Sequence, residues 1–195
     1  MAAALDARDG LTAGHSHRVT EYAIGIGRAM GLPHDQLERI RLAGMIHDMG
    51  KLNTPDAILK KPASLTTEEY EVIKMHPAYT RSIMKNLRLP PGLEGLPDDA
   101  GMHHERADGT GYPNGLQGDS IPLVARILAV ADAFDAITSQ RHYRDARGPE
   151  LAINELRNGS GTQFFPECVQ AFEKYFEAEL KDRFRPGANG EGASA

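Results

Sequence analysis

The chain has 195 residues, of which 41% are hydrophobic and 25% charged, and its net charge is −5 with the histidines neutral. A chain of this length can bury a core without disulfides, and its single cysteine, Cys168, excludes an internal disulfide and favours a cytoplasmic location. The acidic balance argues against a general nucleic-acid-binding surface, and no apolar run approaches the roughly 18 residues that span a bilayer, so we expect no membrane segment.

Apolar residues recur at helical spacing along most of the chain, which predicts an all-α protein. Thr66 and Glu69 have the spacing of a capping box at a helix start, and Pro149 and Pro166 suit the first turn of the last two helices. The apolar pattern over 123–139 is too wide for a surface helix, so we expect this helix to be buried. The predicted helices cover residues 15–30, 35–47, 66–75, 77–87, 98–104, 123–139, 149–159 and 166–184.

Two segments rich in glycine and proline, 88–97 and 107–122, are predicted to be loops. The last ten residues, 186–195, consist mostly of Gly, Ala, Ser and Asn, which predicts a disordered tail. We therefore expect one domain over residues 1–185.

A His-Asp pair is the first sign of chemistry. His47 and Asp48 end a predicted apolar helix, and Gly50 follows closely. Imidazole and carboxylate together suit a divalent first-row metal, and an aspartate can bridge two ions. Lys51 lies about one helical turn past Asp48, so its ammonium can reach a phosphate held by the metals.

Further candidate ligands share one property, a place on or at the end of a predicted helix with apolar neighbours. The cores of helical bundles are a usual place for di-metal sites. Any one of these residues alone is more often a hydrogen-bonded core or surface group, and His17 and His34 are interpreted in that way. The candidates are His15, His76, His103, His104 and Asp132.

Asp132 is the most informative of them, because it lies inside the most apolar predicted helix. A buried carboxylate needs a partner, and no basic residue lies one turn away on either side. Asp135, one turn on, adds repulsion unless a cation or donor is near. Mixed nitrogen and oxygen ligands without cysteine fit iron, manganese, cobalt or nickel.

Two segments suit the binding of a ligand. Gly109 and Gly111 allow a backbone path that other residues cannot follow, and Tyr112 offers a hydroxyl or a ring face. Arg141 and Arg144, three residues apart, suit phosphate or guanine edges. Alone, the first segment would be interpreted as a surface loop and the second as a solvated helix end.

Together these segments resemble the HD-GYP subgroup of the HD-domain phosphohydrolases. They occur in the family's order and spacing over roughly residues 15–165. The bare His-Asp pair is shared by many phosphohydrolases, whereas the long GYP-containing segment is highly specific. The matching segments are HSHRV at 15–19, HDMGK at 47–51, Lys61-Pro62 with Leu65-Thr66, His76-Pro77, HHERADGTGYP at 103–113, ADAFDA at 131–136 and Arg141 to Arg144.

The resemblance implies an all-α, HD-domain-like helical bundle with a dinuclear metal site in its core. It also implies hydrolysis of cyclic di-GMP to linear pGpG and, in some members, to GMP. We expect the two divalent ions to be iron or manganese, with cobalt and nickel left open. The ligands implied by residue match are His15, His47, Asp48 and Asp132 for one ion, and a bridging Asp48 with His76, His103 and His104 for the other.

Other roles also follow from the match. Asp48 and Lys51 are the expected catalytic residues. Asp135 and Glu105 are expected to contact the ligand residues without binding the metal themselves. The expected substrate contacts are Lys51, Asp108, Gly111, Tyr112, Arg141 and Arg144.

The chain departs from the family pattern at two positions. Members with a third metal carry a Glu four residues before the first ligand histidine, and Leu11 stands there, so two ions are expected rather than three. His142 occupies a position where proline is common, and we attach no function to it.

The context of the domain stays open. HD-GYP domains usually follow a sensor or receiver domain, so the chain is either an excised output domain or a stand-alone form. Its partners are then a sensor or receiver domain or a diguanylate cyclase, and the sequence leaves a homodimer open. Two alternatives remain: the same metal core acting on another cyclic dinucleotide or nucleotide, and a non-catalytic module that binds cyclic di-GMP or a partner protein.

Overall fold

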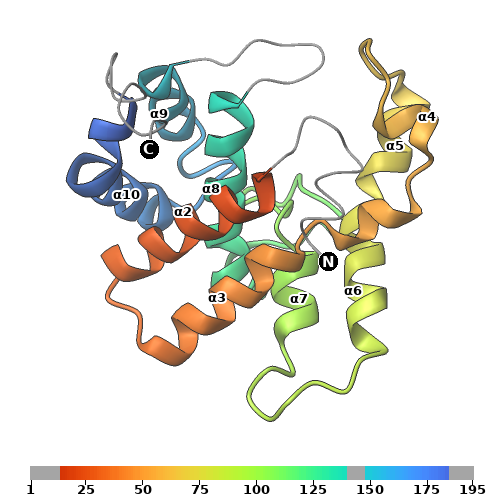
Figure 1. Ribbon diagram of the computed structural model, residues 1–195, viewed down its shortest axis with the longest axis horizontal. Helices are drawn as coiled ribbons and strands as arrows, with labels where there is room; N and C mark the ends of the chain where they lie inside the picture. Colours follow the sequence, from red (N-terminus) through yellow and green to blue (C-terminus); the bar gives the residue numbers. More distant parts are fainter. Residues whose placement is uncertain (1–13, 140–147, 185–195) are drawn as a thin grey trace, which may run out of the picture.

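Three helices, α2 (His15–Ala29), α3 (His34–Ile46) and α8 (Leu123–Thr138), form the centre of the molecule (Figure 1). The computed structural model describes residues 14–139 and 148–184. Helix α2 packs against both α3 and α8, and side chains such as Ile26 and Phe134 are fully buried between them. Burying each such side chain contributes about 1.5–3 kcal/mol to folding, so these helices are anchored firmly.

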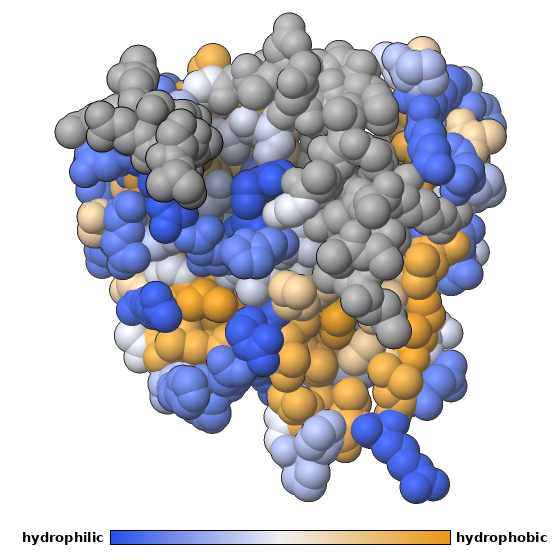
Figure 2. All heavy atoms as spheres, in the orientation of Figure 1, coloured by the Kyte–Doolittle hydropathy of each residue, from blue (hydrophilic) through white to orange (hydrophobic). Residues whose placement is uncertain are grey.

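Helices α6 (His76–Lys85) and α7 (Leu96–Gly101) pack together, and the 3₁₀ helix η1 (Met49–Asn53) lies against α6. Figure 2 shows apolar side chains gathered on the lower part of one face, over these helices and the loop that joins them. In this loop Leu89 and Leu93 pack against the main core, whereas Leu87 is exposed. The loop is therefore fixed to the core by two of its side chains.

Helices α4 (Asp56–Leu59) and α5 (Thr67–Lys74) form an arm beside α6. Glu69 N–H donates to Thr66 Oγ1 and Thr66 N–H donates to the Glu69 carboxylate, so the predicted capping box is present. No residue of α4 or α5 is buried. The arm is therefore held mainly by its caps and by its contacts with α6.

Helices α9 (Pro149–Asn158) and α10 (Pro166–Tyr175) cover α8 on the far side from this arm. The chain continues after α10 as a π-helical turn, η3 (Phe176–Leu180), and a 3₁₀ turn, η4 (Lys181–Phe184). Another 3₁₀ turn, η2 (Gly118–Ser120), precedes α8. An aromatic cluster joins α8 to these elements, because the Phe134 ring contacts those of Phe172, Phe176 and Phe184.

The all-α prediction is confirmed: residues 14–139 and 148–184 contain no β-strand, only an isolated bridge between Ser160 and Phe164. Within the same ranges, no helix is both long and apolar enough to cross a membrane. The predicted tail 186–195 and the residues Leu11, Arg141, His142 and Arg144 lie outside the described ranges.

Some predicted boundaries were wrong. Helix α7 was expected over 98–104 but spans Leu96–Gly101, because Pro97 is accepted in the first turn of a helix. Helix α4 and η1 were not predicted, since four or five residues carry too little periodicity. The last helix was expected to reach Phe184 unbroken, but the structure changes to a π-helical turn after Tyr175.

Candidate metal centre

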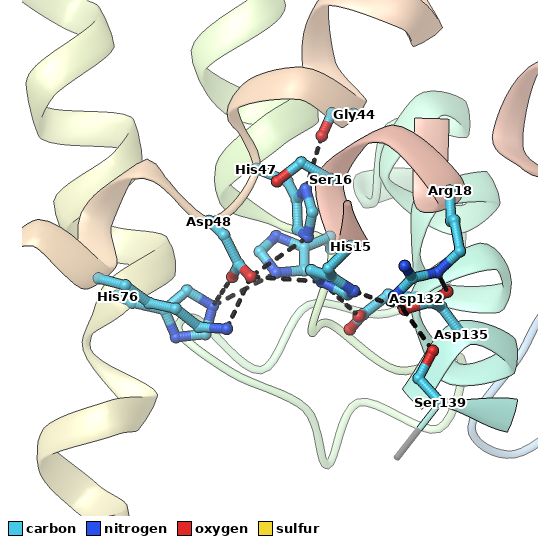
Figure 3. Close-up of polar contacts among 12 residues, drawn as sticks. His15, Ser16, Arg18, Gly44, His47, Asp48, His76, Asp132, Asp135 and Ser139 are labelled. Carbon is cyan, nitrogen blue, oxygen red and sulfur yellow. Dashed lines mark hydrogen bonds and ion pairs between the residues drawn. The ribbon is translucent and has the colours of Figure 1, made fainter. Parts of the chain in front are cut away.

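Seven histidine and aspartate side chains from segments far apart in the chain lie together beside α8. Figure 3 labels five of them, His15, His47, Asp48, His76 and Asp132. His15 and His76 are the first residues of α2 and α6, and Asp132 lies within α8. His47 and Asp48 occupy the turn after α3, and His103 and His104 the turn after α7. The structure thus brings together every residue that was expected to bind metal.

Asp48 stands at the middle of the cluster. Its Oδ2 atom lies 3.5 Å from Nε2 of His15 and 3.5 Å from Nε2 of His47. Its Oδ1 atom lies 3.2 Å from Nε2 of His76. The two oxygens of one carboxylate therefore face two different groups of imidazoles, as a carboxylate that bridges two cations would.

The ligand atoms of the cluster fall into overlapping groups in which all atoms lie within 4.8 Å of one another. One end of the cluster is formed around His15 and the other around His76, and His47, Asp48 and His103 connect them. The groups are His15, His47 and Asp132; His47, Asp48 and His103; and His76, His103 and His104.

Backbone carbonyls orient three of the imidazoles. Nδ1 of His47, His76 and His103 each lies 2.7 Å from a carbonyl oxygen three residues earlier in the chain. A carbonyl oxygen only accepts, so each Nδ1 carries the proton and donates it. In the neutral ring Nε2 then keeps its lone pair, which is the form that binds a metal.

His47 shows most clearly that the site suits a cation. Its side chain is fully buried, and its Nε2 atom has no hydrogen-bond partner among the described residues. An unsatisfied buried nitrogen is costly unless something binds it. Burial also lowers the pKa of His47, and lowers the pKa of His103 and His104 well below the ordinary value. These imidazoles are neutral at pH 7 and ready to accept a metal ion.

His15 is supported by a buried carboxylate instead of a carbonyl. Its Nδ1 atom lies 2.8 Å from Oδ2 of Asp135, and the two oxygens of this carboxylate each accept a hydrogen bond from the Arg18 guanidinium (Figure 3). Burial lowers the pKa of His15, but the contacts with Asp135 and Asp48 outweigh it and raise the pKa to about 9. Arg18 is the cation beside Asp135 that the sequence could not identify.

The carboxylates of the cluster are ionised. Burial favours the neutral form of Asp48, but Lys51 and His47 more than offset it and hold the pKa of Asp48 well below its usual value. Nζ of Lys51 lies 2.6 Å from Oδ2 of Asp48. The Asp132 side chain was expected to be buried, yet it is 18% exposed, because it also lines the adjoining pocket.

The turn that carries His47 and Asp48 is fixed to the start of α6. Thr80 donates its hydroxyl to the His47 carbonyl at 2.8 Å and accepts from Gly50 N–H at 2.8 Å. A Cβ atom added to Gly50 would lie 1.9 Å from the carbonyl oxygen of His76. The close approach of these segments therefore requires glycine at position 50.

The loop after α7 is shaped by Glu105. Its buried carboxylate accepts from the backbone N–H of Asn114 at 2.7 Å and of Leu116 at 2.9 Å. Gly111 packs too tightly against the backbone of His104 for a side chain to fit. The loop thereby places the Tyr112 ring beside the His104 ring, with centroids 4.7 Å apart.

A pocket of about 690 Å³ opens beside the cluster. Its wall includes ligand candidates, residues of α5, the loop after α7, and small side chains of α8. Tyr112 lines this pocket, whereas Lys51, Asp108 and Gly111 do not. The described lining residues are Tyr70, Lys74, His103, His104, Glu105, Arg106, Thr110, Tyr112, Ala129, Asp132, Ala133, Ala136, Ile137, Glu155, Gln163 and Phe164.

The carboxylate of Asp108 is engaged elsewhere. It accepts two hydrogen bonds from the Arg106 guanidinium and further bonds from Thr110. It therefore holds the loop rather than facing the pocket. Tyr70 and Lys74, which do face the pocket, were missed in the sequence, where their only signal is an i,i+4 pair that ends just before His76.

Comparison with known proteins gives concordant results. The family model described as "HD domain" matches residues 1–167. The chain is 40% identical over 170 residues to a "3'3'-cGAMP-specific phosphodiesterase 3" of Vibrio cholerae, covering 87% of this chain and 36% of that protein. It is 40% identical over 178 residues to a "Cyclic di-GMP phosphodiesterase" of Thermotoga maritima, covering 91% and 48%. The chain thus spans between a third and a half of the length of these relatives.

A solved structure has a similar fold. The crystal structure of a cyclic GMP-AMP phosphodiesterase of Vibrio cholerae, V-cGAP3, matches with a TM-score of 0.71 at 21% identity. The match covers 94% of this chain and 48% of that one. At this identity the likeness supports the fold alone.

Proposed function

The chain belongs to the HD-domain family, of the HD-GYP type indicated by its sequence, and on this premise we propose that it is a metal-dependent cyclic di-GMP phosphodiesterase. The observation that carries the proposal is the position of Asp48, whose two oxygens face separate groups of imidazoles. A site of this form suits two divalent ions, and the pocket beside it has room for a nucleotide.

The donor set fits such ions. Five imidazoles and two carboxylates, without a thiolate, suit iron or manganese, and cobalt or nickel are the alternatives. Two ions held between Asp48 and the histidines would polarise the scissile phosphodiester and activate water at neutral pH. We propose His15, His47, Asp48 and Asp132 for one ion, and Asp48, His76, His103 and His104 for the other.

Other residues support the metal site or shape the pocket. Lys51 stabilises the ionised form of Asp48 and supplies a positive charge close to the reacting phosphate. Tyr112 presents its ring on the pocket wall, and Glu105 and Asp108 keep its loop in shape. Arg141 and Arg144, outside the described residues, are proposed as further phosphate contacts.

A second candidate substrate, 3'3'-cGAMP, is supported by one of the relatives. A relative at 40% identity is named as specific for 3'3'-cGAMP, which differs from cyclic di-GMP in one base. The metal site acts on the phosphodiester that both share, so only the pocket wall can distinguish them. Since the relatives are longer than this chain, we also propose that a sensor or receiver domain controls the activity in the whole protein.

Purification without oxygen, with iron or manganese supplied, tests the proposal. We expect two ions per chain and hydrolysis of cyclic di-GMP to pGpG or GMP, with 3'3'-cGAMP compared side by side. Asp48→Ala should remove metal and activity together. His17→Ala is the control, because His17 is exposed on the same helix as His15. Binding of cyclic di-GMP without hydrolysis by the fully loaded protein would favour the non-catalytic alternative.

A further inference from the structure

The pocket wall opposite α8 contains a lysine that no part of the metal site uses. Lys74 is the last residue of α5, and it lines the pocket together with Tyr70 and Tyr112. Its Nζ atom lies 5.8 Å from the ring centroid of Tyr70 and 5.5 Å from that of Tyr112. Both rings are therefore within the range in which an aromatic face attracts an ammonium group.

Only two Lys or Arg side chains, Lys74 and Arg106, are among the described residues that line this pocket. Two nitrogens of the Arg106 guanidinium, Nε and Nη2, donate to the Asp108 carboxylate, and Nε also donates to the Thr110 hydroxyl. The ion-pair partner of Lys74 is Glu71, whose side chain is 60% exposed. An exposed pair of this kind is worth little, so Lys74 is the cation that can turn to a ligand at small cost.

The chemistry of a cyclic dinucleotide requires such a cation. Its two phosphates lie on opposite sides of the ring, so one can reach the metal cluster while the other stays away from it. Each phosphate carries a full negative charge, which is costly to enclose without a partner. A pocket that holds both therefore needs a positive charge at a distance from the metals.

We propose that Lys74 binds the second, non-scissile phosphate of a cyclic dinucleotide. The rings of Tyr70 and Tyr112 hold its ammonium group at the pocket wall before the substrate arrives. Lys74 thereby selects substrates with two phosphates over those with one. This inference rests on the proposed function, and it adds a recognition element on the α4–α5 arm.

The test compares a cyclic dinucleotide with bis(p-nitrophenyl) phosphate, a diester that has a single phosphate. Lys74→Met should raise the KM for cyclic di-GMP roughly tenfold, because a charge-assisted contact to phosphate is lost. The kcat for cyclic di-GMP should change much less. The kcat/KM for the single-phosphate diester should fall far less than the kcat/KM for cyclic di-GMP. Lys74→Arg should restore most of the affinity, since it keeps the charge.

Lys60→Met is the matched control, because Lys60 lies on the same arm and pairs with Asp56 but does not line the pocket. Lys60→Met should leave the KM and kcat for both substrates unchanged. The proposal is overturned if Lys74→Met has the wild-type KM, or if it loses bound metal and both activities equally. If the wild-type protein cleaves the single-phosphate diester but no cyclic dinucleotide, the proposed function itself fails.

Discussion

Oδ2 of Asp135 lies 2.8 Å from Nδ1 of His15, although 120 positions separate the two residues in the chain. Arg18 donates to the same carboxylate, so Asp135 stays ionised in a buried position. The arrangement fixes the ring of His15 and makes its Nε2 atom a stronger donor to a metal.

Asp135→Asn should weaken metal binding without removing a proposed ligand. Loss of such a supporting carboxylate typically costs about 10–100-fold in metal affinity. Competition with a chelator measures the change. Ser139→Ala is the control, because Ser139 accepts from Arg18 without bonding to His15 in the structure. Equal losses of metal affinity in both variants would show that the effect comes from the Arg18 network and not from the contact between Asp135 and His15.

Metal binding should release a proton at pH 7. The pKa of His15 is raised to about 9, so the metal-free protein carries a proton on this ring, and a metal that takes its Nε2 must displace it. Below pH 9 the affinity should therefore rise with pH, and it should level off above that value. His47, His103 and His104 have lowered pKa values and add nothing near neutrality.

Calorimetric titration in two buffers with different heats of ionisation measures this release. A heat that does not depend on the buffer would contradict the assignment. Asp135→Asn provides a second check, because it removes one of the contacts that raise the pKa of His15.

Gly50→Ala should disturb the metal centre through the backbone. The added Cβ would meet the carbonyl of His76, so the turn with Asp48 must move away from α6. Overpacking of this kind costs about 1–3 kcal/mol of folding free energy. We expect a lower melting temperature and less bound metal. Gly148→Ala is the control, since its φ of −61° suits alanine and only the Glu150 side chain is near.

Local signals in the sequence predicted most of the helices. The Thr66–Glu69 capping box and the proline at the start of α9 act within a few residues, so they can be recognised without the fold. The shifted bounds of α7 and the π-helical turn after α10 were missed, because packing against neighbouring helices decides them.

The same distinction applies to the site. The histidines and aspartates could be chosen from the sequence because these residue types and the family pattern mark them. Arg18 as the partner of Asp135, and Lys74 between two tyrosines, depend on contacts between distant segments. The sequence indicated that Asp135 needs a cation or a hydrogen-bond donor nearby, but it could not name that residue.

One wall of the pocket belongs to a helix that has no share in the core. Every residue of α5 is at least partly exposed, yet Tyr70 and Lys74 of this helix line the same pocket as the candidate ligands His103, His104 and Asp132. The free energy of local unfolding should therefore be lower for α5 than for α8, which packs against several other helices. A ligand that touches α5 must therefore spend part of its binding free energy on keeping this helix in place. Tight binding then depends on a molecule long enough to contact both α5 and α8.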